Sequence, residues 1–153
     1  MTQDVAVEKQ QASIGLLSNR GEQMTTEMTP IDWATRPLKK YADFSGRAPR
    51  AEYWWFYLLI IIGYIVATIL DSLLGLDGAV GPYGIVTALF GLAVLIPSIA
   101  VGARRLHDTD RSGWWLLIGL IPLIGAIVLL VFFVLPGTQG SNRFGPDPYG
   151  RGA

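Results

Sequence analysis

Residues 104–115 read RRLHDTDRSGWW, and this stretch concentrates the side chains that are most able to do chemistry. It contains the only histidine of the chain, His107, and two carboxylates, Asp108 and Asp110. Three arginines flank these groups: Arg104, Arg105 and Arg111. An imidazole beside two carboxylates suits three kinds of site, which are a metal centre, a general acid–base catalyst and a network of salt bridges.

A metal site at this stretch requires three or four ligands in a fitted geometry. His107, Asp108 and Asp110 supply three, so Glu52 or Asp43 from a neighbouring segment would complete the set. One histidine without any cysteine is a weak donor set, and the nearby arginines compete for the same carboxylates. We therefore predict no metal and no cofactor.

Catalysis is the second kind of site. Histidine has an unperturbed pKa of about 6.5, which suits general acid–base chemistry. No nucleophile motif or phosphate-binding glycine loop accompanies His107, and the spaced aspartates of lipid-headgroup phosphotransferases are missing. We predict that the chain is not an enzyme; an interfacial membrane enzyme that uses His107, Asp108 and Asp110 is the alternative.

A salt-bridge network uses more of these residues than either alternative. A second charged group precedes another apolar run, as the 104–111 group does. Arginine pairs bidentately with carboxylate or phosphate, so the two groups either close on themselves or bind an anionic lipid headgroup or an acidic loop of a partner. The predicted charge cluster comprises Arg47, Arg50, Glu52, Arg104, Arg105, His107, Asp108, Asp110 and Arg111.

Helix ends alone offer a simpler interpretation of the same stretch. Arg104 and Arg105 suit a helix C-terminus, where cations are favourable and lipid phosphates are within reach. The candidate N-caps of a following helix are Asp108, Thr109, Asp110 and Ser112. On this interpretation the charges position two helices and bind nothing.

The elements around these charges are strongly apolar. The chain is 51% hydrophobic and 16% charged, against about 25% charged for an average soluble domain. No charged residue occurs in 53–70, 78–103 or 112–142, and about 20 apolar residues suffice to cross a bilayer as a helix. The sequence therefore predicts an all-α integral membrane protein with three transmembrane helices, at about 53–74, 83–103 and 114–135.

The third predicted span leaves two topologies open. Gly119, Pro122 and Gly125 cluster at its centre, and proline disrupts helical hydrogen bonding. A kinked single crossing is the favoured interpretation, because the span is long enough to cross once. A re-entrant hairpin that turns at Pro122 is the alternative, and it would return Arg143 and Asp147 to the side of the 104–111 charges.

The rest of the chain is divided by composition. Residues 1–30 are polar and are predicted to form a mobile tail without a signal peptide, 31–148 form the membrane domain, and 149–153 are the C-terminal end. Within the domain, 31–44 mixes aromatic with basic residues, a pattern typical of the membrane interface. Basic residues precede the first span and lie between the second and third, but are missing between the first and second, which places the N-terminus in the cytoplasm.

Small residues also recur along the second span at spacings of three and four. This periodicity places them on one helix face, where close approach lets membrane helices associate. The predicted packing stripe comprises Gly84, Ala88, Gly91, Leu95, Ser98 and Gly102.

Three motifs, in order around three apolar runs, resemble a known family. They are FSGRAPRAEYWWF at 44–56, RRLHDTDRSGWW at 104–115 and PGTQGSNRFGPDP at 136–148. The chain resembles the bacterial inner-membrane family of unknown function numbered 805, the YhaH/YhaI-like proteins. The resemblance implies a small multi-pass protein of the bacterial inner membrane and implies no reaction. Its last motif adds Asn142, Arg143, Phe144 and Asp147 to the candidate site residues.

These observations predict a structural or interaction role in the membrane. Basic and acidic residues number twelve each, so we expect no nucleic-acid partner. The predicted partners are membrane lipids, with a second copy or another membrane protein as further options. A transport or channel component is an alternative function, although few ionisable groups lie within the predicted spans.

Overall fold

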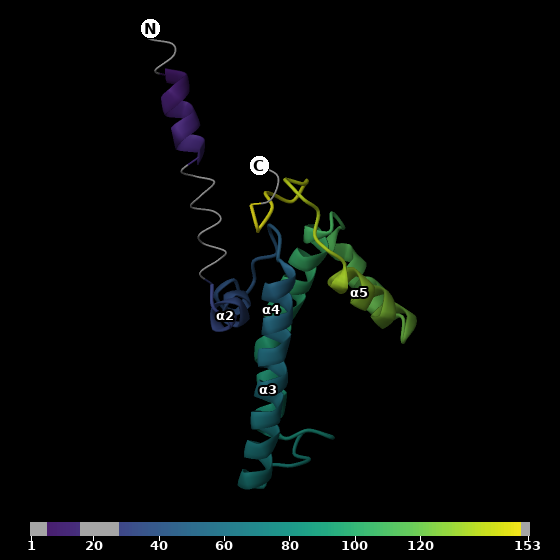
Figure 1. Cartoon of the computed structure of the whole chain (residues 1–153). Helices are drawn as coiled ribbons and strands as arrows, with labels where there is room; N and C mark the ends of the chain where they lie inside the picture. The colour runs from purple at the N-terminus through teal and green to yellow at the C-terminus, as the bar shows by residue number, and fades with distance from the viewer. Residues whose placement is uncertain (1–5, 16–27, 151–153) are drawn as a thin grey trace.

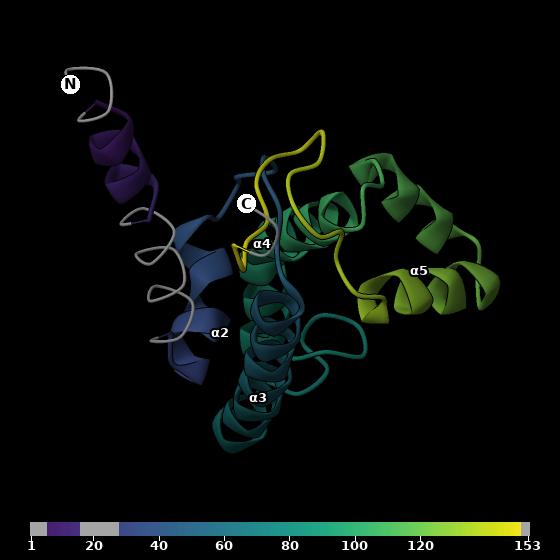
Figure 2. The ribbon, with the colours of Figure 1, turned by 45° about the horizontal axis from the view of Figure 1, so that its top comes forward.

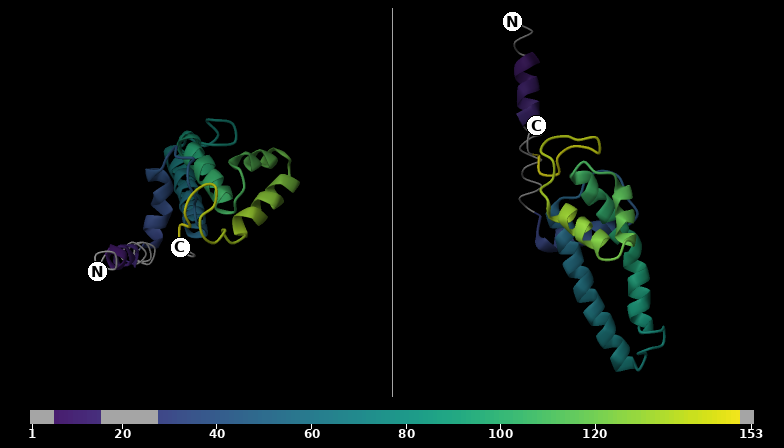
Figure 3. Two further views of the ribbon diagram at one scale, coloured as in Figure 1. Left: turned by 90° about the horizontal axis from the view of Figure 1, so that it is seen from above. Right: turned by 90° about the vertical axis from the view of Figure 1, so that its right-hand side faces the viewer.

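The computed structural model describes residues 6–15 and 28–150, and these residues are helical without any strand. Its named elements are α2 (Pro30–Lys39), α3 (Arg50–Leu74), α4 (Ile85–Asp108), the 3₁₀ helix η1 (Gly113–Leu120) and α5 (Ile124–Val134). The predicted all-α class is therefore confirmed. The right-hand view of Figure 3 shows α3 and α4 side by side, and Figure 1 shows α2 on one flank of this pair and α5 on the other.

The first two predicted spans are present as α3 and α4. Their 25 and 24 residues give lengths of about 37 and 36 Å, which exceed the hydrocarbon thickness of about 30 Å. Both helices are long and apolar enough to cross a membrane. A turn joins their far ends, so they run antiparallel (Figure 3). α3 ends at Gly75, whose left-handed φ of 67° lets the chain leave the helix.

The third predicted span, 114–135, is not one helix, and this part of the prediction is corrected. It divides into η1 and α5, and Figure 2 shows η1 leading away from α4 and α5 returning toward it. The guanidinium of Arg105, near the end of α4, donates to the carbonyls of Phe133 and Leu135. The segment thus starts and finishes at the same end of α4, and its backbone reverses as the hairpin alternative expects.

The tip of the hairpin has a backbone conformation that proline helps to set. The Ile124 amide donates to the Pro122 carbonyl across 2.8 Å, and Leu123 between them has φ of 65° and ψ of −60°. This is a γ-turn of the rarer, positive-φ kind, which is strained for a bulky residue. Gly125 then allows close contact of the arms, because a Cβ there would lie 1.8 Å from the Ile118 carbonyl oxygen.

α2 is an amphipathic helix that crosses the α3–α4 pair. Figure 1 views α2 along its axis while α3 and α4 lie in the plane of the picture. A capping box between Thr29 and Asp32 starts it, and Trp33, Ala34 and Pro37 are buried beneath it. Residues 6–15, within the predicted tail, form a helix with exposed side chains; the rest of 1–27 lies outside the described residues.

A side chain from the segment after α2 replaces the hydrogen bond that a proline removes from α4. Pro97 has no amide hydrogen, so the helix does not use the carbonyl of Ala93, four residues earlier. The Tyr41 hydroxyl donates to that carbonyl at 2.5 Å. This bond joins the interfacial segment to the middle of α4, at a point where a membrane helix otherwise leaves a polar group unpaired.

The predicted small-residue stripe is correct only in part. A Cβ on Gly91 would lie 2.9 Å from the Tyr64 hydroxyl, so this glycine packs closely on α3. Gly84 abuts Asp71 of α3, whose carboxylate accepts the Val86 and Thr87 amides and so caps α4. Leu95, in contrast, is 52% exposed and lies outside the contact.

The hairpin makes a prediction about sidedness, and the absence of cysteine makes it testable. Single cysteines replace the exposed residues Asp110, Ser141 and Ala79, the last of which lies in the α3–α4 turn. We expect the first two to share one pattern of reaction with a membrane-impermeant maleimide and Ala79→Cys to show the opposite pattern. Labelling is measured before and after the inner membrane is broken, and a Ser141→Cys pattern matching Ala79→Cys contradicts the hairpin.

Candidate functional site

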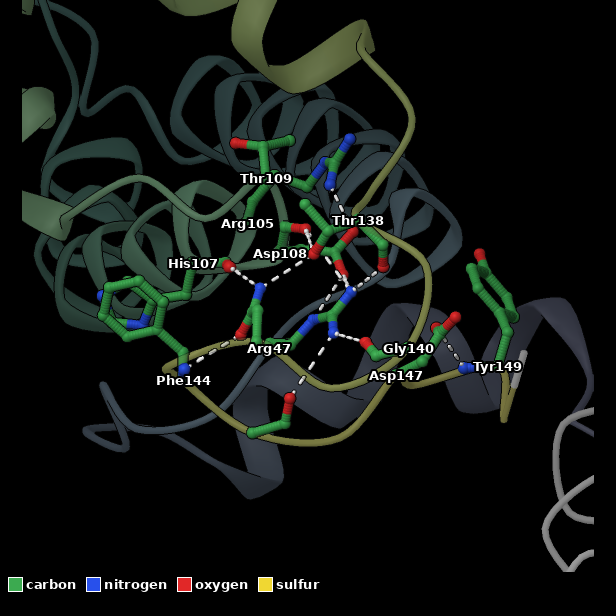
Figure 4. A network of polar contacts seen from close by, with 12 residues as sticks. Arg47, Arg105, His107, Asp108, Thr109, Thr138, Gly140, Phe144, Asp147 and Tyr149 are labelled. Carbon is green, nitrogen blue, oxygen red and sulfur yellow. Dashed lines mark hydrogen bonds and ion pairs between the residues drawn. The ribbon is translucent and has the colours of Figure 1, made fainter. Parts of the chain in front are cut away.

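The centre of the site is the carboxylate of Asp108, the last residue of α4. Arg47 Nε donates to its Oδ1 at 3.0 Å and Arg105 Nη1 donates to its Oδ2 at 2.6 Å. Asp108 is 2% exposed and Arg105 is fully buried. One buried carboxylate is therefore shared by two arginines, one from α4 and one from the segment before α3 (Figure 4).

The same two arginines also bind the chain after α5. Arg47 Nη1 donates to the Gly140 carbonyl at 2.6 Å, and its Nη2 donates to the Thr138 carbonyl, as Figure 4 shows. Arg105 Nε donates to the Phe133 carbonyl at 3.1 Å. Backbone carbonyls thus supply the acceptors that a single carboxylate cannot supply to two guanidinium groups, each of which has five N–H donors.

Close backbone approach makes this arrangement possible. A Cβ on Gly137 would lie 2.1 Å from Asp108 Oδ2, so only glycine lets the chain pass over the carboxylate here. The next residue then pairs with the end of α4, because the Thr138 amide donates to the Asp108 carbonyl at 2.9 Å. Residues 136–140 therefore dock by their backbone. We call Arg47, Arg105 and Asp108, together with these backbone acceptors, the arginine–aspartate lock.

A second buried ion cluster joins α2, α3 and α4. Arg104 Nη1 donates to Glu52 Oε1 at 2.6 Å, and Arg36 Nε lies 3.5 Å from Glu52 Oε2. Arg104 and Glu52 are both fully buried. Arg104 also presents its carbonyl to the Ala48 amide at 2.9 Å, which ties the segment before α3 to the C-terminal end of α4.

His107 lies at the edge of the lock, where the C-terminal motif covers it. Its Nδ1 is 3.1 Å from the Gly46 carbonyl oxygen, and its ring stacks on Phe144 with centroids 3.9 Å apart (Figure 4). Asn142 holds the motif in place by donating to the His107 carbonyl at 2.9 Å. Arg143 pairs with Asp110 at 3.2 Å, at an exposed position.

The three side chains considered for a metal or a catalyst face different partners. Asp108 is paired with Arg47 and Arg105, and Asp110 is paired with Arg143. His107 contacts the Gly46 carbonyl. Within 6–15 and 28–150, no three histidine or carboxylate side chains gather as a metal-binding group. Asp43 is engaged as well: hydrogen bonds from the hydroxyl and then the amide of Ser45 lower the pKa of its carboxyl.

The remaining predicted residues lie around the lock. Arg50 is exposed and donates to the Val134 carbonyl at 3.3 Å, while the Arg111 guanidinium lies 4.2 Å from the Phe132 ring centroid. The Asp147 carboxylate accepts the Tyr149 amide at 2.9 Å. Sequence reasoning missed Arg36 as a network member and missed the backbone acceptors at Thr138 and Gly140, since a carbonyl carries no residue-type signal.

Two long apolar helices, an apolar hairpin and buried salt bridges at one end define a small helical membrane protein. The chain belongs to the family described as protein of unknown function DUF805, whose profile matches residues 41–146. The resemblance predicted from the three motifs is therefore confirmed. It assigns the chain to an uncharacterised membrane-protein family and brings no reaction with it.

Relatives in Escherichia coli strain K12 agree with this assignment. The inner membrane protein YhaH is 52% identical over 118 residues, which cover 77% of this chain and 97% of YhaH. The inner membrane protein YhaI is 48% identical over 118 residues, covering 77% and 96%. The uncharacterized protein YiiR is 32% identical over 131 residues, covering 69% and 85%. The names of YhaH and YhaI support a location in the inner membrane. No solved structure matches the chain.

The two aspartates of the opening motif allow a matched test of the lock. Asp108→Asn leaves two buried arginines without their anion, and we expect a loss of about 3–5 kcal/mol, as for other broken buried pairs. Asp110→Asn removes only the exposed pair with Arg143, and we expect a change of about 0–1 kcal/mol. Thermal unfolding in mild detergent measures both variants.

Double-mutant cycles then identify the partners of Asp108. We expect strong coupling of Asp108 to Arg47 and to Arg105, and none to Arg50, which contacts only a carbonyl. Equal destabilisation by Asp108→Asn and Asp110→Asn, together with zero coupling to both buried arginines, would leave helix capping as the whole role of the motif.

Proposed function

We propose that this chain is a non-catalytic interaction protein that binds an anionic phospholipid beside α2. The family has no assigned reaction, and the charged motif, which is where catalysis would be sought, is occupied by internal contacts. The observation that carries the proposal is an open apolar groove whose end at α2 adjoins lysines. The apolar groove suits an acyl tail and the lysines suit an anionic headgroup, and an anionic phospholipid has both.

The arginines of the lock are poorly suited to bind a headgroup themselves. Arg105 is fully buried and Arg47 is 7% exposed, and Arg104 of the neighbouring Glu52 cluster is fully buried as well. The nitrogens of Arg47 and Arg105 already donate to Asp108 and to carbonyls of the C-terminal segment. A lipid phosphate would have to displace these contacts. We therefore propose that the lysines at the end of α2 bind the anionic lipid, in place of the predicted charge cluster.

The groove of about 550 Å³ lies between α2, α3 and α4. This volume falls within the range of about 300–1,000 Å³ that is typical of ligand sites. Its lining is apolar over almost its whole surface, which suits an acyl chain. The residues that define its course are Leu38, Tyr41, Phe56, Ala67, Phe90 and Ala93.

Basic side chains stand where the headgroup of such a lipid would lie. Lys39 and Lys40 are adjacent to Leu38 and Tyr41, the two groove residues contributed by the α2 segment. Lys39 is exposed, and Lys40 is partly exposed with its amine 3.7 Å from Asp43. Each lysine near an anionic surface contributes about 1 kcal/mol to binding, so the pair favours phosphatidylglycerol over zwitterionic lipid.

The proposed orientation places α2, the lock and the C-terminal segment on the cytoplasmic side. The α3–α4 turn at the opposite end has no lysine or arginine, whereas the lock end is rich in both, which supports this orientation through the positive-inside rule. The proposed topology is two spanning helices and one re-entrant hairpin. Its arms, of eight and eleven residues, are each about 16 Å long, which is half of the hydrocarbon thickness.

Lipid retention tests the lysines. The chain is purified in mild detergent at low ionic strength, and bound phosphatidylglycerol and phosphatidylethanolamine are quantified by native mass spectrometry. We expect the double variant Lys39→Gln, Lys40→Gln to lose roughly 10- to 30-fold in affinity for phosphatidylglycerol and little for phosphatidylethanolamine. Lys9→Gln, in the exposed helix at 6–15, is the matched control.

A second pair of variants tests the groove. Ala93→Trp fills it and is expected to reduce retention of both lipids, whereas Leu92→Trp, at a 66% exposed position that does not line the groove, is expected to leave retention unchanged. Equal retention by all variants, or loss with both tryptophans alike, argues against a lipid site beside α2.

A further inference from the structure

We propose a second binding site, between α4 and the hairpin, that takes a neutral amphipathic molecule through a hydroxyl donated to His107 Nε2. The site is a pocket of about 410 Å³ at the lock end of α4. It shares no lining residue with the groove beside α2, so the two sites are independent. His107 and Ser112 are its polar side chains, and Phe44, Ala103 and Trp114 are among its apolar ones.

The hydrogen bond on the other side of the imidazole assigns the role of Nε2. Nδ1 lies 3.1 Å from the carbonyl oxygen of Gly46, which only accepts, so Nδ1 carries the proton of the neutral ring. Nε2 is then an acceptor, and Nδ1 is the ring nitrogen that is hydrogen-bonded within the described residues. The parallel Phe144 ring, tilted by 4°, fixes the imidazole plane.

Nε2 is directed toward the hairpin side of the ring. A Cβ built on Gly113, the first residue of η1, would lie 3.5 Å from Nε2 and 3.0 Å from the Ala103 Cβ. Gly113 thus leaves open the space beside this nitrogen that any larger residue would occupy. The Ser112 hydroxyl oxygen already accepts the Trp114 amide at 3.4 Å, whereas Nε2 of His107 has no hydrogen bond to any of the described residues.

An apolar extension continues the pocket toward the hairpin tip. A second cavity, of about 370 Å³, shares Ile99, Leu116 and Leu117 with the first and reaches Leu120 and Leu129. The two therefore adjoin, with the acceptor at one end and only apolar contacts at the hairpin end. A ligand that fits both has a small neutral head and an apolar tail.

The charges around the pocket offer no partner to a charged head. Arg143 is paired with Asp110, and Arg105 is paired with Asp108 in the lock. None of these four side chains therefore presents an unpaired charge to the pocket. A donor is required because a second acceptor opposite Nε2 would leave both lone pairs unpaired. A hydroxyl on an apolar body meets both conditions. A diacylglycerol and a prenylated hydroquinone both carry this group, and they are distinguished experimentally.

Selective ¹⁵N-histidine labelling tests the proposal directly, because the chain has one histidine and gives one pair of ring-nitrogen signals. The full chain in detergent is titrated at about pH 8, well above the ordinary histidine pKa of about 6.5. The probes are dioctanoylglycerol and a short-chain prenyl hydroquinone, each matched with its analogue in which the hydroxyls are capped as acetate or methyl ether.

We expect the unprotonated Nε2 signal to move to lower frequency with at least one free-hydroxyl probe, and the Nδ1 signal to stay in place. The capped analogue should bind at least tenfold more weakly, as loss of one buried hydrogen bond implies. The probe that moves the signal identifies the source of the hydroxyl. A static Nε2 signal at saturating concentrations of both probes, or equal binding of capped and free forms, overturns the proposal.

Two variants separate the ligand from the fold. Ile99→Trp blocks the junction of the two cavities and is expected to weaken probe binding tenfold or more, while Leu92→Trp, outside both cavities, is not. His107→Phe keeps an aromatic ring against Phe144 and removes the acceptor, so free and capped probes should then bind alike. Unchanged binding to Ile99→Trp places the probe elsewhere and contradicts the site.

Discussion

The shared carboxylate of Asp108 is the interaction on which the rest of the structure depends. Two buried guanidinium groups facing one buried carboxylate leave an excess of positive charge, and such a charge is tolerated only where further acceptors surround it. Those acceptors are backbone carbonyls at Phe133, Thr138 and Gly140, all of which follow or end α5. Satisfying the arginines therefore requires the chain after the third apolar segment to return to the end of α4.

That requirement favours one of the two backbone paths that hydropathy leaves open for the third apolar segment. The segment 113–135 has enough apolar residues to cross a bilayer once, and its amino-acid composition is equally suitable for a crossing or a hairpin. The local chemistry permits the hairpin: Pro122 and the γ-turn at Leu123 reverse the chain, and Gly125 lets the arms touch. The N–H donors of Arg47 and Arg105 favour the hairpin over a single crossing, because a crossing would carry their carbonyl acceptors to the opposite side of the membrane.

Much of this architecture could be predicted from the sequence, and the part that could not has a physical reason. Uncharged stretches between charged turns indicated α3 and α4, and the mixture of aromatic and basic residues indicated an interfacial segment. The sequence did not indicate which charged residues pair with each other inside the network. Arg104 and Arg105 are neighbours in sequence, yet consecutive helical side chains diverge by about 100°, so one pairs with Glu52 and the other with Asp108. Carbonyl acceptors and the close approach at Gly137 leave no pattern in residue type.

The division between buried and accessible charge bears on where this protein interacts. The most charged stretch of the sequence is the natural place to seek an active site, but its arginines and Asp108 serve to hold three apolar elements and the C-terminal segment together. The accessible polar groups lie beside the lock and not within it. They are the lysines that end α2 and the His107 ring, whose second nitrogen faces a pocket. A charge that is fully paired and buried specifies the fold, whereas a polar group with one partner and one open side can bind a ligand. In this chain both kinds occur within four consecutive residues, since Arg105 and Asp108 belong to the first kind and His107, between them in sequence, belongs to the second.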